Sequence, residues 1–484
     1  METGSAERPN ILFILSDDQG AWALRCAGNK EIDTPNLDRL ASTGMRFENF
    51  FCASPVCSPA RASLLTGRIP SQHGIHDWIA AGGTLAKYEP ARNGELIEYL
   101  AHQPGYTDFL AAAGYHCGIS GKWHLGDSHH AQKSFSLWDV HAKGGGPYYN
   151  APMIKNGKVF EEPGYVTDVI TANALRWLAE QKKNKHPFYL SVHYTAPHAP
   201  WEREQHPSDL YDRYYNECAF ESLPAGLAPP DWVQHLNNPN PVDSREKRRV
   251  CLSGYYAAVT AMDYNIGRLL DWVETSGIRK NTLIVFTGDN GMNMGQHGVF
   301  GKGNATFPLN MFEESVKVPF IISQAGRINP GLTNSDLVSQ YDFMPTLLDY
   351  VGIDNPTGAM LPGRSFVNSL RGESSRSRDH VVVFDEYGPV RMVRTREWKY
   401  VHRYADGPNE LYDIKNDPGE EVSLAGNAKY RTIEDEMRQR LMEWFARYLD
   451  PDRDGAHEMV TGLGQLGFCG RYADGKGSFT GPAW

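Results

Sequence analysis

The sequence predicts an α/β protein in which helices sandwich a mostly parallel sheet, with a smaller C-terminal α+β domain. Four short apolar runs are typical of buried parallel strands: residues 10–16, 115–120, 188–194 and 282–287. Beyond residue 379, three short strand patterns precede one helix pattern, which predicts a small antiparallel sheet. We therefore expect a large domain at residues 1–370 and a second domain at residues 379–484.

Length and composition describe an ordinary globular protein. The 484 residues exceed what one small core supports, and 41% apolar with 22% charged residues is a typical balance. No apolar run approaches the roughly 20 residues that span a bilayer, so we expect no membrane segment. The net charge of −10 argues against nucleic acids and long polyanions as ligands. The seven cysteines lack disulfide-framework or metal-ligand spacing.

Oxygen-bearing side chains follow two of the predicted strands. Asp17 and Asp18 come directly after the first strand, and Asp289 and Asn290 follow the strand at 282–287. Open α/β sheets bind ligands at such strand ends. Adjacent carboxylates repel and should raise one another's pKa unless a cation lies between them. Because no His or Cys stands in these strings, a hard cation, Ca²⁺ or Mg²⁺, is favoured over zinc.

Residues 57–68 predict a loop that leads into a short helix. Ser58 suits the N-cap, Pro59 the first helical position and Gly67 the C-terminal end. Cys57 would then lie just before a helix N-terminus, where the helix dipole favours a thiolate or a bound anion. A buried structural cysteine is the alternative interpretation of this position.

The whole string, Cys-x-Pro-x-Arg followed by Ala-Ser-Leu-Leu-Thr-Gly-Arg, resembles the signature of the type I sulfatases. The string Gly-Lys-Trp-His-Leu-Gly at 121–126 and the segment 336–352 are similar to the same family. The resemblance implies an alkaline-phosphatase-like fold and hydrolysis of a sulfate monoester. It also implies bound calcium and conversion of Cys57 to formylglycine by a formylglycine-generating enzyme.

The resemblance further implies two sets of site residues. The metal-binding set is Asp17, Asp18, Cys57, Asp289 and Asn290. The catalytic set is Cys57, Arg61, Lys122, His124, His198 and Lys302. In this set the modified Cys57 is the nucleophile, Arg61 stabilises it and the two lysines hold the sulfate oxygens. His124 would contact the hydrated aldehyde, and His198 would lie near the leaving oxygen.

Aromatic and polar residues in the loops 73–78 and 196–201 predict a carbohydrate substrate. The candidate substrate-binding residues are His76, Asp77, Trp78, Trp201 and His297. Such side chains suit stacking on a sugar face and hydrogen bonding to its hydroxyls. Because the cations are used by the nucleophile and one sulfate, we expect a small sulfated sugar bound end-on.

Several alternatives to that substrate stay open. An aryl or choline sulfate is one, and a phosphodiesterase or phosphonate monoester hydrolase of the same superfamily is another. A protein that binds anions without catalysis belongs to a different class. The oligomeric state is also left open by the sequence.

Three remaining features concern the surface and the cellular location. Residues 202–249 are polar and rich in proline, and predict an irregular insertion or lid on the substrate side. The first nine residues contain no apolar signal-peptide core, which indicates a cytoplasmic chain, or a periplasmic or secreted one if its start has been trimmed. The glycosylation acceptor Asn304-Ala305-Thr306 stands beside Lys302, which argues against maturation in a eukaryotic secretory pathway.

Overall fold

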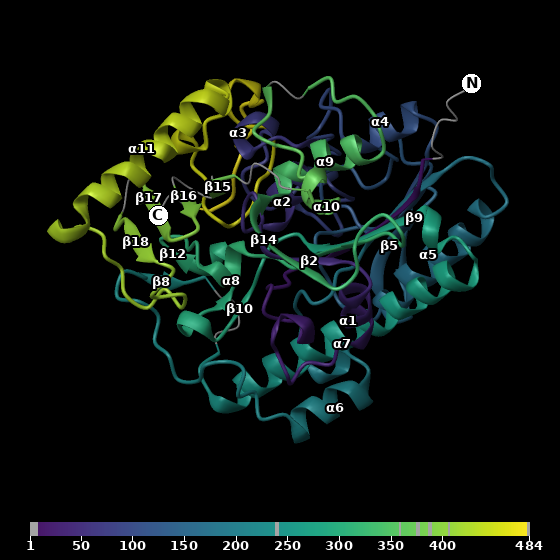
Figure 1. Ribbon diagram of the computed structural model, residues 1–484, viewed down its shortest axis with the longest axis horizontal. Coiled ribbons are helices and arrows are strands. Elements are labelled where there is room, and N and C mark those ends of the chain that lie inside the picture. The colour runs from purple at the N-terminus through teal and green to yellow at the C-terminus, as the bar shows by residue number, and fades with distance from the viewer. Residues whose placement is uncertain are drawn as a thin grey trace.

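A ten-stranded mixed sheet organises the protein. The computed structural model describes residues 8–237, 242–357, 360–373, 378–385, 390–404 and 407–481. Across the sheet the strands are β14 (Leu332–Ser339), β2 (Met45–Phe51), β13 (Phe320–Ser323), β9 (Thr282–Gly288), β1 (Asn10–Ser16), β7 (Phe188–His193), β3 (His116–Lys122), β4 (Leu137–His141), β5 (Ala151–Lys155) and β6 (Lys158–Glu162) (Figure 1).

The middle of the sheet is parallel and its flanks are mixed. Strands β9, β1, β7, β3 and β4 run parallel to one another. Strand β13 is antiparallel to both of its neighbours, and β5 and β6 add an antiparallel pair at one edge. The expected mostly parallel sheet is therefore confirmed, and the carboxyl ends of its central strands lie along one edge.

Alternation of side chains along β1 divides the interior into two cores. Ile11, Phe13 and Leu15 belong to one core, whereas Leu12 and Ile14 belong to the other. Helices that contribute to the first core are α2 (Cys57–Thr66), α4 (Tyr106–Ala112) and α9 (Phe343–Tyr350). Helices of the second core are α1 (Pro35–Ser42), α5 (Val166–Gln181), α6 (Ser208–Glu217) and α7 (Arg245–Thr275). Helices thus sandwich the sheet, as predicted.

The C-terminal part forms the predicted antiparallel sheet with a helix against it. Its strands are β15 (His380–Asp385), β16 (Val390–Thr395), β17 (Trp398–Arg403) and β18 (Glu410–Asp413), and its helix is α11 (Arg431–Tyr448). Val382 and Tyr400 pack in one cluster with Leu441 of the helix. Val381 instead belongs to the core of the large sheet, so this part packs directly against the large one. Of the segment between the two, 374–377 lie outside the described residues.

The predicted irregular insertion at 202–249 is partly regular. It contains α6 and the start of α7, where Ser244 Oγ accepts a hydrogen bond from Lys247 N at 3.2 Å. The short strand β8 (His235–Leu236) pairs with β12 (Thr306–Phe307), and 238–241 lie outside the described residues. The other short elements are α3 (Pro70–His73), β10 (Asn293–Met294), β11 (Phe300–Gly301), α8 (Glu313–Val316) and α10 (Val367–Leu370). Within the described ranges, no helix combines the length and apolarity needed to cross a membrane.

Candidate active site

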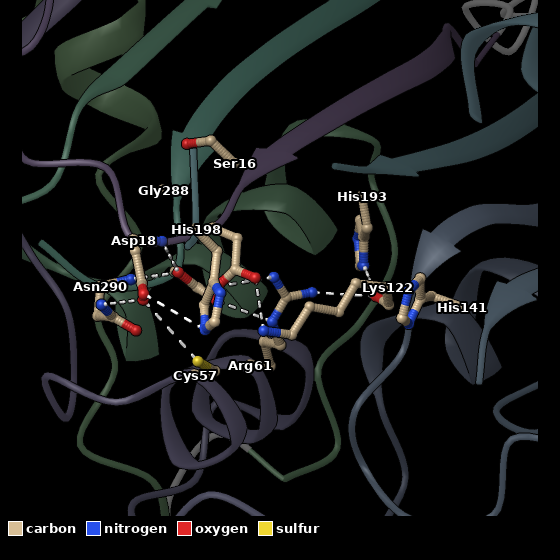
Figure 2. Close-up of polar contacts among 12 residues, drawn as sticks. Ser16, Asp18, Cys57, Arg61, Lys122, His141, His193, His198, Gly288 and Asn290 are labelled. Carbon is tan, nitrogen blue, oxygen red and sulfur yellow. Dashed lines mark hydrogen bonds and ion pairs between the residues drawn. The ribbon is translucent and has the colours of Figure 1, made fainter. Parts of the chain in front are cut away.

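The four predicted oxygen ligands meet at the carboxyl end of the sheet. Strands β1 and β9 pair in parallel register up to Ser16 and Gly288, so the residues that follow each strand emerge side by side. Asp18 N donates a hydrogen bond to Asp289 Oδ1 at 3.1 Å, and Asn290 Nδ2 donates to Asp18 Oδ1 at 2.9 Å (Figure 2). All four side chains, including that of Asp17, are buried.

Two predicted catalytic cations bind these carboxylates directly. Lys122, the last residue of β3, places Nζ 2.6 Å from Asp17 Oδ2. Arg61, one turn into α2, donates from Nε to Asp289 Oδ2 at 2.8 Å and from Nη1 to the carbonyl oxygen of Lys122 at 3.0 Å. His193 donates from Nδ1 to the same carbonyl oxygen at 3.0 Å. The guanidinium therefore links the ends of β9 and β3 (Figure 2).

Cys57 is the first residue of α2 and Val56 is its N-cap, so the helix begins two residues earlier than predicted. Ser58 is not the N-cap, and its Oγ instead accepts a hydrogen bond from Ile79 N at 3.1 Å. The thiol faces Lys302, whose Nζ lies 2.8 Å from Cys57 Sγ. Burial nevertheless raises the pKa of the Cys57 thiol to about 12, which outweighs the nearby ammonium groups. The prediction of a thiolate at position 57 is therefore wrong for the unmodified cysteine side chain.

The chain's own cations change the ionisation expected of the carboxyls. Burial raises the pKa of Asp17, although an ammonium contacts it. Burial acts in the same direction on Asp18, but the Lys302 ammonium at 2.5 Å lowers its pKa overall. The Arg61 guanidinium likewise outweighs burial and lowers the pKa of Asp289. Neighbouring carboxylates still raise the pKa of Asp17 and Asp289, as predicted, but the chain's own cations make the net pKa shift of Asp18 and Asp289 downward.

Buried oxygen atoms without partners indicate room for a cation. Asp17 Oδ1 and Asn290 Oδ1 accept no hydrogen bond from any described residue, although both are buried. One ligand atom each from Asp17, Asp18 and Cys57 lies within 4.8 Å of the others. Unpaired buried oxygens are costly, and clustered oxygens are the ligands that Ca²⁺ and Mg²⁺ prefer. The residues present therefore fit a hard divalent cation.

The two predicted catalytic histidines line the same cavity as Cys57 and have defined ring orientations. His124 Nε2 lies 3.1 Å from the carbonyl oxygen of Ile79, so it carries the hydrogen, and Nδ1 is a buried acceptor without a partner among the described residues. Burial lowers the pKa of His124 well below 6.5, which keeps the ring neutral. His198 donates from Nδ1 to the carbonyl oxygen of Ala199 at 2.7 Å, and its Nε2 lies 3.6 Å from Asp18 Oδ2.

The structure adds site residues that the sequence analysis missed. His141 and His193 end β4 and β7, and burial lowers their pKa values to about 4 and about 3 (Figure 2). Gln340 Nε2 donates a hydrogen bond to the carbonyl oxygen of Asp289 at 2.6 Å and so fixes the backbone of the loop after β9. The strand-end argument that selected Asp17 did not reach the two histidines, because no strand was predicted at 137–141 and His193 lies inside the predicted strand 188–194. No local pattern marks the glutamine.

A cavity of about 850 Å³ opens beside these groups. Four members of the predicted catalytic set line it: Cys57, His124, His198 and Lys302. Further lining residues come from three distant segments: Trp78, Tyr88 and Glu89; Leu236 and Asn237; Gly462 and Leu463. The insertion at 202–249 and the C-terminal tail thus both reach the cavity. The tail was not predicted to contribute to any site.

The five predicted substrate-binding residues are distributed between the cavity and its supports. Trp78 lines the cavity. The backbone N–H of His76 donates to Gln465 Oε1 at 2.8 Å, and Asp77 Oδ2 accepts from Gly464 N at 3.0 Å, so both residues anchor the C-terminal tail.

Trp201 and His297 lie in other surroundings. The Trp201 ring packs against Tyr255, and its Nε1 donates to the carbonyl oxygen of Pro197 at 2.9 Å. The His297 ring stacks on Phe312 with the ring centroids 3.8 Å apart, and its Nε2 lies 3.1 Å from Glu314 Oε2. Neither side chain is among the described residues that line the cavity.

Comparison with known proteins agrees with this geometry. Residues 9–353 match the sulfatase family, and residues 295–447 match a family described as N-sulphoglucosamine sulphohydrolase, C-terminal. An N-acetylglucosamine-6-O-sulfatase of Bacteroides thetaiotaomicron is 30% identical, and the match covers 93% of this chain and 88% of that protein. A choline-sulfatase of Rhizobium meliloti is 28% identical over 89% of this chain and 84% of its own length.

Solved structures show the same relationship. A protein whose structure was solved in complex with its substrate D-glucosamine-2-N,6-O-disulfate superposes with a TM-score of 0.74 at 28% identity, over 93% of this chain and all of the other. A phosphonate monoester hydrolase of Agrobacterium radiobacter, at 22% identity and a TM-score of 0.66, shares the fold over 92% of this chain and 96% of its own. Because the family match covers most of the sequence, this chain belongs to the sulfatase family of sulfuric ester hydrolases.

Proposed function

We propose that this chain hydrolyses a sulfate monoester of a small carbohydrate, with a divalent metal ion and formylglycine at position 57. The observation that carries the proposal is the buried cluster of carboxylates and cations around Cys57, which opens into the substrate-sized cavity. A sulfate monoester carries negative charge on oxygens that must be neutralised in the transition state. Lys302 contacts Asp18 and also lines the cavity, which supports a role in holding those oxygens.

The metal site would use the side-chain oxygens of Asp17, Asp18, Asp289 and Asn290, together with the group at position 57. When present, calcium supplies positive charge for the sulfate, and the hydrated aldehyde supplies an oxygen nucleophile. Magnesium has the same ligand preference and is the alternative ion. Conversion of Cys57 requires a formylglycine-generating enzyme as a partner during maturation.

The chain's own residues orient the nucleophile and move the protons. Arg61 holds Asp289 and the end of β3 in fixed positions, so that the carboxylates cannot turn away from the cation. His124 presents its unprotonated Nδ1 inside the site, where it can accept a proton from a hydroxyl group at position 57. His198 keeps Nδ1 on a backbone carbonyl, which leaves Nε2 to donate a proton to the departing alcohol.

A sugar bound end-on agrees with the charges of the cavity. The site's three cations contact carboxylates of the site, and the chain carries a net charge of −10. Among the described residues that line the cavity, Lys143 is the one lysine or arginine besides Lys302, so a long sulfated polymer would find few cations there. We expect release of sulfate from mono- and disaccharides to exceed release from internal positions of the parent polymer.

The test combines identification of the residue at position 57 with assays on matched esters. Mass spectrometry of the Cys57 peptide should show the aldehyde, and the wild type should release sulfate faster than phosphate or phosphonate from the same alcohol. Cys57→Ala should abolish turnover, whereas Cys251→Ala, on the half-buried side of α7, should not. Normal activity of Cys57→Ala, or preference for phosphorus esters, would contradict the proposal.

We also propose that the chain matures without a glycan at Asn304. This side chain lines the cavity and donates from Nδ2 to the carbonyl oxygen of Gly462 at 3.2 Å. A glycan on that nitrogen would occupy the space of the substrate. Detection of a glycan on Asn304 in active native enzyme would contradict this.

A further inference from the structure

Glu89 places a carboxylate in the wall of the cavity, apart from the metal-binding and catalytic sets. The residue is 7% exposed and lines the same cavity as Cys57 and Lys302. Its hydrogen-bond partners among the described residues are two backbone N–H groups of its own loop. The chemistry of sulfate release therefore does not require this carboxylate, and its position needs another explanation.

The loop around Glu89 fixes one carboxylate oxygen and leaves the other unpaired. Oε2 accepts hydrogen bonds from Gly83 N at 2.9 Å and from Thr84 N at 3.1 Å. Oε1 accepts none from the described residues. A Cβ atom at position 83 would lie 3.1 Å from Oε1, so the glycine lets the loop close tightly around the carboxylate. The side chain is thus held in one orientation before any ligand binds.

The surfaces near this carboxylate suit the ring of a sugar. Trp78 and Tyr88 contribute aromatic rings to the cavity wall, and Leu463 contributes an apolar side chain from the C-terminal tail. Sugar rings combine an apolar face, which packs on aromatic rings, with hydroxyl groups that need acceptors. A fixed carboxylate forms stronger hydrogen bonds than a neutral acceptor does.

We propose that Glu89 is a specificity-determining residue that accepts a hydrogen bond from a hydroxyl or protonated amino group of the substrate's alcohol part. This rests on the proposed sulfatase function and adds to it the residue that selects the alcohol. Sulfated sugars and amino sugars satisfy Oε1, whereas an alcohol without a donor covers this oxygen and forms no hydrogen bond with it. The latter therefore binds less well, because the carboxylate oxygen loses its solvent and gains no partner.

Glu89→Gln tests the assignment, since it keeps the shape and an acceptor for Gly83 and Thr84 but removes the charge. The substrates are glucose 6-sulfate, glucosamine 6-sulfate and 4-nitrophenyl sulfate. The alcohol part of 4-nitrophenyl sulfate has no hydroxyl group besides the esterified one. We expect kcat/KM on both sugars to fall about 10- to 100-fold, mainly through KM. The value of kcat/KM for the aryl ester should stay within about twofold of the wild-type value. Glu98→Gln removes the same charge at an exposed position and should change none of the three.

The two sugars distinguish the two possible donors. A larger loss on glucosamine 6-sulfate assigns the amino group to Glu89, whereas equal losses assign a hydroxyl. An equal loss on the aryl ester, or no loss on the sugars, would overturn the proposal. So would choline sulfate as the best substrate with the same dependence on Glu89, because choline has no N–H donor.

A substrate comparison with the wild type does not depend on folding of the variant. Glucose 6-sulfate should be preferred over cyclohexylmethyl sulfate, which has the ring but no hydroxyl, by at least about 10-fold in kcat/KM. Equal rates would overturn the role of Glu89. If the wild type cleaves none of these esters, 4-nitrophenyl sulfate included, the proposed function itself fails, which is a different result from lost selectivity.

Discussion

Two buried clusters of charged residues contain similar groups but differ in how completely those groups are paired. The site cluster consists of Asp17, Asp18, Arg61, Lys122, Asp289 and Lys302. The interface cluster consists of Glu313, Arg394, Lys399 and Glu420, and it joins α8 to the C-terminal sheet. Each cluster has equal numbers of carboxylates and cations.

The interface cluster leaves fewer buried atoms without a hydrogen bond. Among its described side chains, Glu420 Oε1 is the one such buried atom, and it contacts the Lys399 ammonium. Glu313 Oε1 contacts Arg394 Nε at 3.3 Å and Lys399 Nζ at 3.5 Å. Glu420 pairs with Lys399 through Oε1 and accepts from Glu313 N through Oε2 at 2.7 Å. Each carboxylate therefore has partners inside the protein, and the cluster acts as a connection between two parts of the chain.

The site cluster keeps unsatisfied atoms. Asp17 Oδ1 and Arg61 Nη2 lie 3.9 Å apart as an ion pair, but neither forms a hydrogen bond with any described residue, and Lys302 lines the cavity. Buried ion pairs contribute little net stability, so a cluster with unpaired atoms is costly unless a ligand completes it. The comparison teaches that burial of charge does not distinguish the two clusters. What distinguishes the site cluster is the group of ligand atoms from Asp17, Asp18 and Cys57, and a lysine that lines the cavity.

The largest expected effect is on activity, at the site cluster. Lys302→Met should lower kcat/KM at least about 10²- to 10³-fold, because it removes a cation that faces the sulfate. With calcium present, its unfolding temperature should stay close to that of the wild type. Steady-state kinetics and thermal unfolding check this. A stability loss with normal turnover would contradict the assignment of the two clusters.

The same substitution in the interface cluster should have the opposite result. Lys399→Met removes the ammonium group that Glu420 and Glu313 share, and both carboxylates stay buried. This loss should lower the unfolding free energy by about 3–5 kcal/mol. The value of kcat/KM for the folded fraction should remain within about twofold of wild type. Chemical denaturation measures the first quantity. Loss of turnover without loss of stability would show that this cluster also serves catalysis.

Glu420 should make stability depend on pH. Burial, opposed by Lys399, raises the pKa of Glu420 from 4.5 to about 7. The folded state holds the proton of Glu420 more tightly than the unfolded state does. The contribution of this residue to the unfolding free energy is therefore complete below pH 4.5. It is lost as the pH rises to about 7, by up to about 3 kcal/mol.

The variant Glu420→Gln lacks this titration. The difference in unfolding free energy between wild type and Glu420→Gln should therefore fall as the pH rises from 5 to about 7. Denaturation at a series of pH values gives this difference directly. A difference that is constant or rises with pH would show that the carboxyl is already ionised throughout this range.

The smallest expected effect is stabilisation by a metal ion. Calcium at about 100 times its dissociation constant should stabilise the wild type by about 2.7 kcal/mol, which raises the unfolding temperature by a few degrees. Lys399→Met should keep this increase, and Asp18→Asn should lose most of it. If neither calcium nor magnesium shifts the wild-type transition, the incomplete pairing of the site cluster needs another explanation.

Local sequence patterns predicted the central parallel strands and the candidate oxygen ligands that follow two of them. The apolar run at 10–16 predicted β1, and the polar residues after it predicted a site at the sheet edge. Both follow from interactions within a few residues and from the general geometry of parallel sheets. The roles of Cys57 and its neighbours came instead from a resemblance that no periodicity reveals.

The tertiary structure alone decided which cation meets which carboxylate and what closes the cavity. Lys122 meets Asp17 across 105 positions of sequence, and Lys302 meets Asp18 across 284. Gln465, from the C-terminal tail, bonds the backbone of His76 across 389 positions. A local pattern specifies where a strand ends and which residue types follow it. It cannot specify such partners, because their meeting depends on strand order, register and packing of the whole chain.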